Sequence, residues 1–128
     1  MNLLIDTHLL LWAAQGIEHL SLDARVLMSK PENDLFFSVA SLWEIVIKNG
    51  LSRKDFNVDP RIFRRCLLDN GYHELQVLSD HVISTGLLPP IHKDPFDRLL
   101  IAQAMTEGFL LLTADMQVAK YPGPIQHV

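Results

Sequence analysis

Acidic side chains recur where apolar segments of this chain end. Asp6 and Asp115 each follow a short apolar run, Asp97 follows a proline, and Glu44 interrupts a helical apolar pattern. Carboxylates that gather in one place repel one another unless they take up protons or share a cation. Mg²⁺ and Mn²⁺ prefer such oxygen ligands. These ions also suit phosphoryl transfer, so phosphodiester hydrolysis is one chemistry that these residues could support.

Asp97 is expected in the first turn of a buried helix. Asp94 suits the N-cap position and Pro95 the first helical position, where a missing N–H costs nothing. A structural alternative remains open, because an aspartate in the first turn also serves the helix end and its dipole. The apolar residues that follow indicate burial on most sides: Leu99, Leu100, Ile101, Ala102, Ala104 and Met105.

Asp6 and Asp115 are expected at the carboxyl ends of two buried strands. Continuous apolar runs are typical of strands that are covered on both faces, as in a parallel sheet. Ligands of open α/β sheets bind at the carboxyl ends of the strands. The alternative for Asp6 is again a helix N-cap, and the neighbouring Thr7 could cap or could hold the carboxylate by a hydrogen bond.

Glu44 lies in a predicted helix over residues 39–49. Ser41, Glu44 and Lys48 share one face of that helix. The face could be solvated, with Glu44 capping or pairing with Lys48, or it could direct the carboxylate into a cleft. The helix alone does not decide between these.

Predicted strands alternate with predicted helices along the whole chain. This order predicts one α/β domain over residues 1–128, with a parallel sheet and right-handed crossovers. In such a sheet the strand carboxyl ends share one edge, so all four acidic residues could converge there. The strands are expected at 2–6, 35–38, 72–77, 109–113 and 125–128, and the helices at 7–16, 21–29, 39–49, 61–70, 79–87 and 95–108.

Composition narrows the function classes. The net charge of −4 and the pI of about 5.8 argue against a protein that grips nucleic acid through a broad basic surface. No apolar run is long enough for a membrane span, and the N-terminus lacks the pattern of a signal peptide. The single Cys66 excludes an internal disulfide. We therefore expect a cytoplasmic protein.

Several side-chain environments follow from the same patterns. We expect Cys66 and Trp43 in the core and Arg98 paired with an acidic neighbour. We also expect two helices to turn particular apolar residues inward, namely Leu22, Val26 and Leu27 on one, and Val82 and Ile83 on the other.

The motifs together resemble the PIN-domain ribonucleases, and most of all the VapC-like toxins of bacterial toxin–antitoxin systems. The resemblance spans Asn2 to the C-terminus with the segments in the family's order. The combination of Asp-Pro-Phe-Asp-Arg with Trp-Glu is its most specific part. The matching segments are Asp6-Thr7-His8, Ser38 to Lys48, His92 to Ala104 and Thr113-Ala114-Asp115.

The resemblance implies a three-layer α/β/α fold around about five parallel strands, and an endoribonuclease that depends on Mg²⁺ or Mn²⁺. It further implies a homodimer, a cognate antitoxin that blocks the cleft, and a tRNA or ribosomal RNA substrate. Trp12, Trp43 and the leucine-rich first helix could contribute to those interfaces. Asp6, Glu44, Asp97 and Asp115 match the family's four acidic positions, with Thr7, Ser41 and Thr113 as supporting hydroxyls.

The resulting hypothesis is hydrolysis by a metal-activated water that attacks an RNA phosphodiester in line, leaving 5′-phosphate and 3′-hydroxyl ends. Two alternatives stay open. One is a non-catalytic binding module that kept the fold. The other is a receiver-like phosphotransfer domain, which would want adjacent acidic residues after the first strand, where this chain has Asp6-Thr7.

Overall fold

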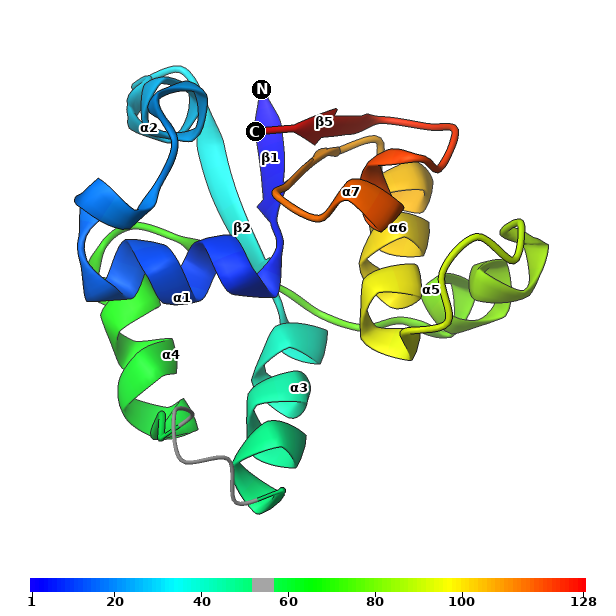
Figure 1. Cartoon of the computed structure of the whole chain (residues 1–128), viewed down its shortest axis with the longest axis horizontal. Coiled ribbons are helices and arrows are strands. Elements are labelled where there is room, and N and C mark those ends of the chain that lie inside the picture. The colour runs from blue at the N-terminus through cyan, green and yellow to red at the C-terminus, as the bar shows by residue number, and fades with distance from the viewer. Residues whose placement is uncertain (52–56) are drawn as a thin grey trace.

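The protein is described here from a computed structural model, which places residues 1–51 and 57–128. One sheet of five parallel strands runs through its centre, with helices on both sides (Figure 1). This confirms the predicted three-layer α/β/α architecture. The strands are β1 (Asn2–Ile5), β2 (Asp34–Ser38), β3 (His73–Leu75), β4 (Leu110–Thr113) and β5 (Ile125–His127).

The predicted helices connect the strands in the predicted order, and the structure adds a short helix, α7, that the sequence analysis did not predict. They are α1 (Thr7–Gln15), α2 (Leu22–Ser29), α3 (Val39–Gly50), α4 (Pro60–Asp69), α5 (Ser79–Ser84), α6 (Pro95–Glu107) and α7 (Met116–Ala119), with short 3-10 turns η1 (Ile17–His19) and η2 (Thr85–Leu87). Among the described residues, no helix combines the length and the apolar character that a membrane span requires.

The strand order is β3-β2-β1-β4-β5. The chain builds outward from β1 to β2 and β3, then returns to the other side of β1 with β4 and β5. Leu4 of β1 therefore lies opposite Phe36 of β2 on one side and Leu111 of β4 on the other. The direction of building reverses between β1 and β4. Such a switch point opens a crevice at the carboxyl ends of the strands.

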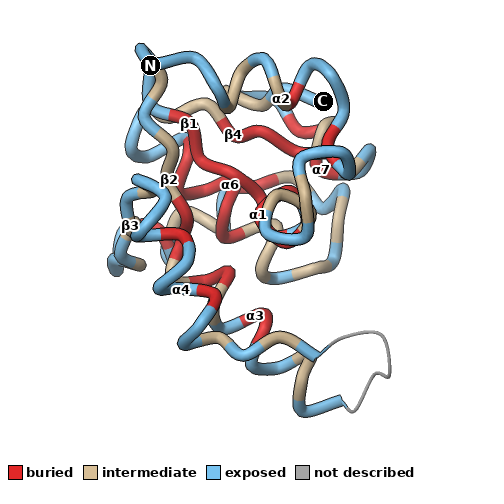
Figure 2. Tube along the Cα trace, turned by 90° about the vertical axis from the view of Figure 1, so that its left-hand side faces the viewer, coloured by how far each residue is buried: buried red, intermediate tan, exposed pale blue. Residues whose placement is uncertain are grey.

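Each face of the sheet carries its own core. Leu3 and Ile5 of β1 face α1, α2 and α4, whereas Leu4 faces α6 and α7, because side chains alternate along a strand. Figure 1 shows these two groups of helices on opposite sides of β1. In Figure 2 the buried residues concentrate on β1, β4 and α6, while the far end of α3 is exposed. Residues 99–104 of α6 are all buried, which confirms the prediction for that stretch, but Met105 is 47% exposed and the prediction of its burial is wrong.

The predicted inward faces of α2 and α5 are mostly wrong, since of the residues named only Leu27 packs against the core. Leu22 is 72% exposed and Ile83 is 71% exposed, and Val26 and Val82 are about half exposed. Ala24 makes the close approach of α2 to the core, and His81 is the buried residue of α5. Both helices are short, so tertiary contacts decide which face packs. On α2 that face carries a small residue, and on α5 it carries a hydrogen-bonded polar residue.

Trp43 and Cys66 are also exposed, contrary to prediction. Helix α3 buries the face that carries Ala40, Ser41, Glu44 and Ile45. Trp43 lies on its flank, where its ring meets Phe96 edge-on with centroids 5.1 Å apart. On α4 the buried positions are Phe63 and Leu67, which leaves Cys66 on the outer face.

A buried polar network joins α6 to the elements around it. The Ser38 hydroxyl donates to Gln103 Oε1 at 2.6 Å, and Gln103 Nε2 donates to the Gln76 carbonyl at 3.2 Å. The buried His81 ring accepts from the Leu78 amide and meets the Glu107 carboxylate at 2.7 Å. The buried histidine therefore has hydrogen-bond partners for both ring nitrogens.

Replacing Gln103 with leucine should destabilise the fold by about 1–3 kcal/mol. The change keeps the volume but leaves the buried Ser38 hydroxyl and the Gln76 carbonyl without this partner. Urea unfolding measures the difference. Gln15→Leu, at an exposed position, is the matched control. Equal stability of the two variants would show that the network contributes little.

Candidate active site

Asp6 stands at the switch point, directly after β1. It is 4% exposed, and its Oδ1 accepts the Leu9 amide of α1 at 3.0 Å. Its Oδ2 accepts the Thr113 hydroxyl, from the end of β4, at 2.5 Å. Burial raises the pKa of Asp6 above its ordinary value, and these hydrogen bonds partly offset that rise. Asp6 therefore does cap α1, but capping alone does not explain why its second oxygen is hydrogen-bonded to Thr113 at the end of β4.

Glu44 is carried to the same edge by α3, which follows β2. The Ser38 hydroxyl starts this helix by accepting the Ala40 amide. Glu44 is 2% exposed, and its Oε2 lies 2.7 Å from Lys48 Nζ, so the predicted i,i+4 pair is present. Its Oε1 is buried with no hydrogen-bond partner among residues 1–51 and 57–128. A buried carboxylate oxygen without a partner is costly and fits a place for a cation.

Asp97 occupies the first turn of α6, as predicted. Asp94, not Asp97, caps the helix by accepting the Phe96 and Asp97 amides. Burial raises the pKa of Asp97 to about 7, and the carboxylates of Asp94, Glu44 and Asp6 add to the rise, whereas a hydrogen bond with His92 lowers it. The structure therefore brings Asp6 and Glu44, two of the other predicted acidic residues, within electrostatic reach of Asp97.

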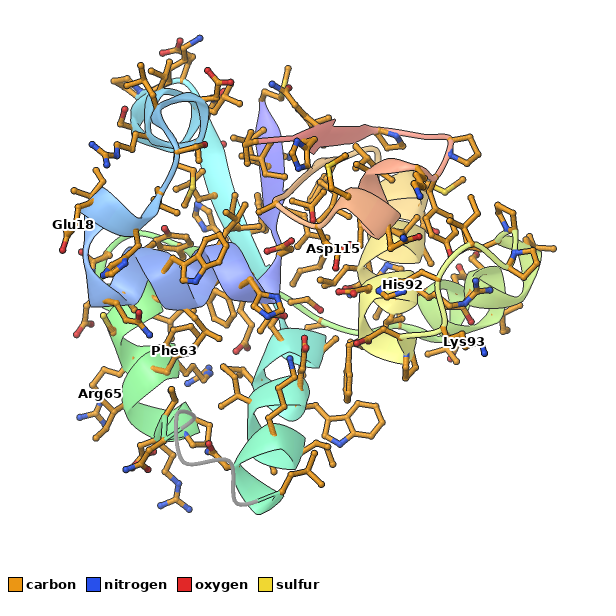
Figure 3. All side chains as sticks on the ribbon, in the orientation of Figure 1. Glu18, Phe63, Arg65, His92, Lys93 and Asp115 are labelled. Carbon is orange, nitrogen blue, oxygen red and sulfur yellow. The ribbon has the colours of Figure 1, made fainter. Side chains whose placement is uncertain are left out.

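Asp115 lies at the rim of this group. Its Oδ1 caps α7 through the Gln117 amide, and its own amide donates to the Thr113 hydroxyl at 3.0 Å. Its side chain is 34% exposed, and its Oδ2 lies 4.0 Å from His92 Nε2. Figure 3 shows Asp115 and His92 close together. Asp115 is thus nearby but more open to solvent than Asp6 and Glu44.

The three supporting hydroxyls have different partners. Thr113 links Asp6 to Asp115, by donating to the carboxylate of one and accepting from the amide of the other. The Thr7 hydroxyl donates to Ser41 Oγ at 2.8 Å, and both side chains are buried. Thr7 thus joins α1 to α3 and does not bond the Asp6 carboxylate, which the sequence had left as one option.

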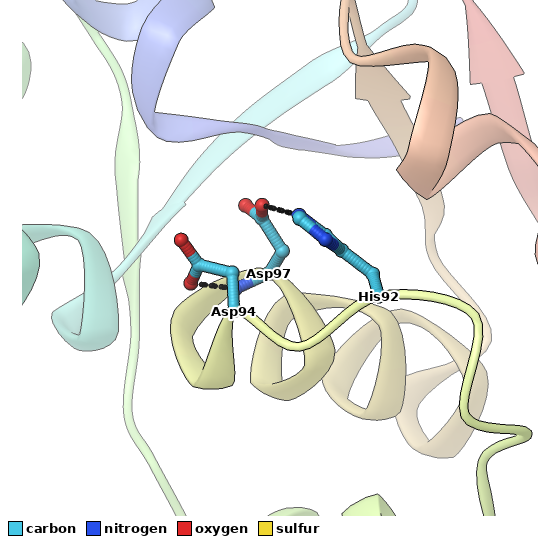
Figure 4. A group of neighbouring side chains, drawn as sticks. All are labelled: His92, Asp94 and Asp97. Atoms are coloured by element: carbon cyan, nitrogen blue, oxygen red, sulfur yellow. Dashed lines mark hydrogen bonds and ion pairs between the residues drawn. The ribbon is translucent and has the colours of Figure 1, made fainter.

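His92 has a contact that the sequence did not reveal. Its Nε2 lies 2.8 Å from Asp97 Oδ2, and Figure 4 shows the ring and the carboxylate facing each other above the start of α6. Ligand atoms of His92, Asp94 and Asp97 lie within 4.8 Å of one another. The available signal was its position just before the Asp94-Pro95 turn, but a loop residue's direction is not set by spacing.

Arg98 pairs with no acidic side chain of residues 1–51 and 57–128, contrary to prediction. Its guanidinium donates to the carbonyls of Thr85, Leu88 and Pro89 and to the Tyr121 hydroxyl. The five N–H donors of arginine suit this role, because the turn from η2 to α6 leaves several carbonyls without a helical or strand partner.

Replacing Thr113 with valine should weaken the fold by about 1–3 kcal/mol, because the buried Asp6 carboxylate and the Asp115 amide lose this partner. Thr113→Ser keeps the hydroxyl and should retain most of the stability. Thermal and urea unfolding at neutral pH compare the three proteins. Valine and serine variants of equal stability would argue against the link between the two aspartates.

Comparison with known proteins places this arrangement. The sequence model of the PIN domain family matches residues 3–124, which is nearly the entire chain. The chain belongs to the PIN domain family. A comparison with curated proteins gives no match. The predicted family is confirmed, and the receiver-like alternative has no support from it.

Solved structures share the PIN fold at low sequence identity. VapBC2 from Rickettsia felis, crystallised with a DNA fragment from its promoter, has a TM-score of 0.70 and 13% identity, with coverage of 99% of this chain and 98% of that chain. DNA-bound VapBC from Salmonella typhimurium has a TM-score of 0.68 and 14% identity, with the same coverage of the two chains. VapBC-1 from nontypeable Haemophilus influenzae has a TM-score of 0.64 and 15% identity, again with coverage of 99% of this chain and 98% of that chain.

Proposed function

We propose that this PIN domain is a divalent-metal-dependent endoribonuclease that acts as the toxin of a toxin–antitoxin pair. The observation that carries the proposal is the buried carboxylate group at the switch point. Asp6 follows β1, Glu44 lies on α3 and Asp97 on α6, and Glu44 Oε1 is buried without a partner among the described residues. A fold that only needed helix caps would not require this oxygen to be buried.

The donor set fits Mg²⁺ or Mn²⁺. Asp6, Glu44 and Asp97 offer carboxylate oxygens, which these hard ions prefer, and Asp115 adds a more exposed one at the rim. When bound, such a cation favours ionisation of an attacking water and offsets the charge of the scissile phosphate. Burial raises the pKa of Asp6, and burial together with neighbouring carboxylates raises that of Asp97, so a cation would stabilise the ionised form of both.

The side chains around the site then have separate tasks. Asp6, Glu44, Asp97 and Asp115 would hold the cation. Thr113 fixes Asp6 relative to Asp115, and the Thr7–Ser41 hydrogen bond fixes α1 against α3. The net charge of −4 offers RNA little general attraction, so the cation itself supplies the local positive charge that a phosphodiester needs. Hydrolysis would leave 5′-phosphate and 3′-hydroxyl ends.

The partners are a cognate antitoxin and a second copy of this chain, and the compartment is the cytoplasm. Homologous folds were solved as VapBC complexes. Trp43, Val46 and Ile47 of α3 are between 43% and 57% exposed, which gives such partners apolar surface close to Glu44. Light scattering of the purified chain tests the dimer.

Incubation of the purified chain with total cellular RNA tests the activity. Mn²⁺ or Mg²⁺ should yield discrete fragments with 5′-phosphates, and both EDTA and Asp6→Ala should abolish them. Mapping the ends identifies the substrate among tRNA and ribosomal RNA. A folded protein that binds Mn²⁺ but cleaves none of this RNA would favour the non-catalytic binding module instead.

A further inference from the structure

The loop before α6 delivers one ring directly onto the carboxylate group. His92 Nε2 lies 2.8 Å from Asp97 Oδ2, and the ring is about one-fifth exposed. An ionised carboxylate only accepts hydrogen bonds, so this contact requires the tautomer with the proton on Nε2. In that tautomer the ring fixes which way Asp97 turns, with Oδ2 held by His92 (Figure 4).

The backbone of His92 is itself fastened by one hydroxyl. The Tyr121 hydroxyl accepts the His92 amide at 2.8 Å and donates to the His92 carbonyl at 3.3 Å. Tyr121 is 4% exposed and follows α7, so its ring is held in the core. The Tyr121 hydroxyl therefore hydrogen-bonds both the backbone N–H and the backbone carbonyl of His92.

Arg98 completes this arrangement from α6. Its Nη1 donates to the Tyr121 hydroxyl and to the Pro89 carbonyl, both at 3.0 Å, and its Nη2 donates to the Thr85 carbonyl at 2.9 Å. With the Arg98 contact, the Tyr121 hydroxyl makes three hydrogen bonds, which uses its full capacity. The loop from Thr85 to His92 is thus held at several points by two side chains.

We propose that His92 is a positioning residue of the metal site, and that Tyr121 and Arg98 act through it by fixing the loop that carries it. The inference rests on the proposed function, because it concerns the same cation site. Residues that orient a metal ligand from outside typically alter metal affinity by 10–100-fold. Nothing in the motif assigns this task to Tyr121, which lies more than twenty residues from the Asp-Pro-Phe-Asp-Arg segment.

Calorimetric titration of the full chain with Mn²⁺ alone tests the proposal. His92→Ala should weaken Mn²⁺ binding by about tenfold. His92→Gln should recover much of the loss, because its side-chain amide can donate to Asp97. Tyr121→Phe should weaken binding by about fivefold, the equivalent of about one hydrogen bond. His19→Ala and Tyr72→Phe, which lie on the opposite side of the sheet, are the matched controls and should bind as the wild type does.

The double variant decides whether Tyr121 acts through His92. In the His92→Ala background, Tyr121→Phe should cause no further loss, since the ring it positions is gone. An equal loss in both backgrounds would overturn the role of Tyr121. Thermal unfolding of each variant confirms that the compared proteins are folded.

Three other outcomes would overturn more. Wild-type affinity in His92→Ala would overturn this inference and leave the proposed function intact. A directly bonded imidazole nitrogen in the pulsed electron paramagnetic resonance spectrum of the Mn²⁺ form that is lost in His92→Ala would also overturn it, since His92 would then be a metal ligand itself. A wild-type protein that binds no Mn²⁺ would overturn both this inference and the proposed function.

Discussion

Asp97→Asn should reduce RNA cleavage by about a thousandfold or more while making the metal-free protein more stable. Burial and three neighbouring carboxylates raise the pKa of Asp97 to about 7. At pH 8 the folded protein therefore holds a charge that its surroundings disfavour. The neutral amide removes that charge at nearly the same volume, but it also removes an anionic oxygen from the proposed cation site.

Two measurements on the same variant separate these effects. Cleavage rates with Mn²⁺ report the loss of activity, and urea unfolding at pH 8 in EDTA reports the gain in stability. Asp69→Asn, at the exposed end of α4, is the control and should change neither quantity. An Asp97→Asn protein that cleaves normally would remove Asp97 from the mechanism, and one that unfolds more easily would show that the charge is not disfavoured.

Stability without metal should fall as the pH rises from about 5 to about 8, and Mn²⁺ should reverse that fall. The folded-state pKa of Asp97, about 7, lies above its ordinary value of 3.8. Between these values the folded state keeps a proton that the unfolded state has released. The free energy of unfolding therefore decreases with pH across this window, in total by on the order of a few kcal/mol, and levels off above it.

A cation that binds the ionised carboxylates should stabilise the fold most where they are deprotonated. Thermal unfolding at several pH values, with EDTA and with excess Mn²⁺, measures both curves. The stabilisation by Mn²⁺ should be larger at pH 8 than at pH 5, and at a thousandfold excess over the dissociation constant it reaches about 4 kcal/mol. A stability that rises with pH in EDTA would contradict the raised pKa, and Asp97→Asn should flatten the curve.

The sequence by itself determined the architecture and the location of the acidic residues. Apolar runs that alternate with capped helices leave few choices for an α/β chain, because strands without a polar face must be covered on both sides. The same logic located Asp6 and Asp115 after strands and Asp97 in the first turn of α6, and these local placements are confirmed. Local signals suffice there, since a cap and the end of a strand depend on adjacent residues.

Only the tertiary structure decided which side chains meet. Periodicity turned four exposed residues of α2 and α5 inward and placed Trp43 in the core, because the rotation of a helix depends on what it packs against. The contact joins His92 from the loop before α6, Arg98 from α6 itself and Tyr121 from the segment after α7. No spacing encodes such contacts. They exist because unpaired carbonyls and a buried hydroxyl must find partners once the sheet has brought their segments together.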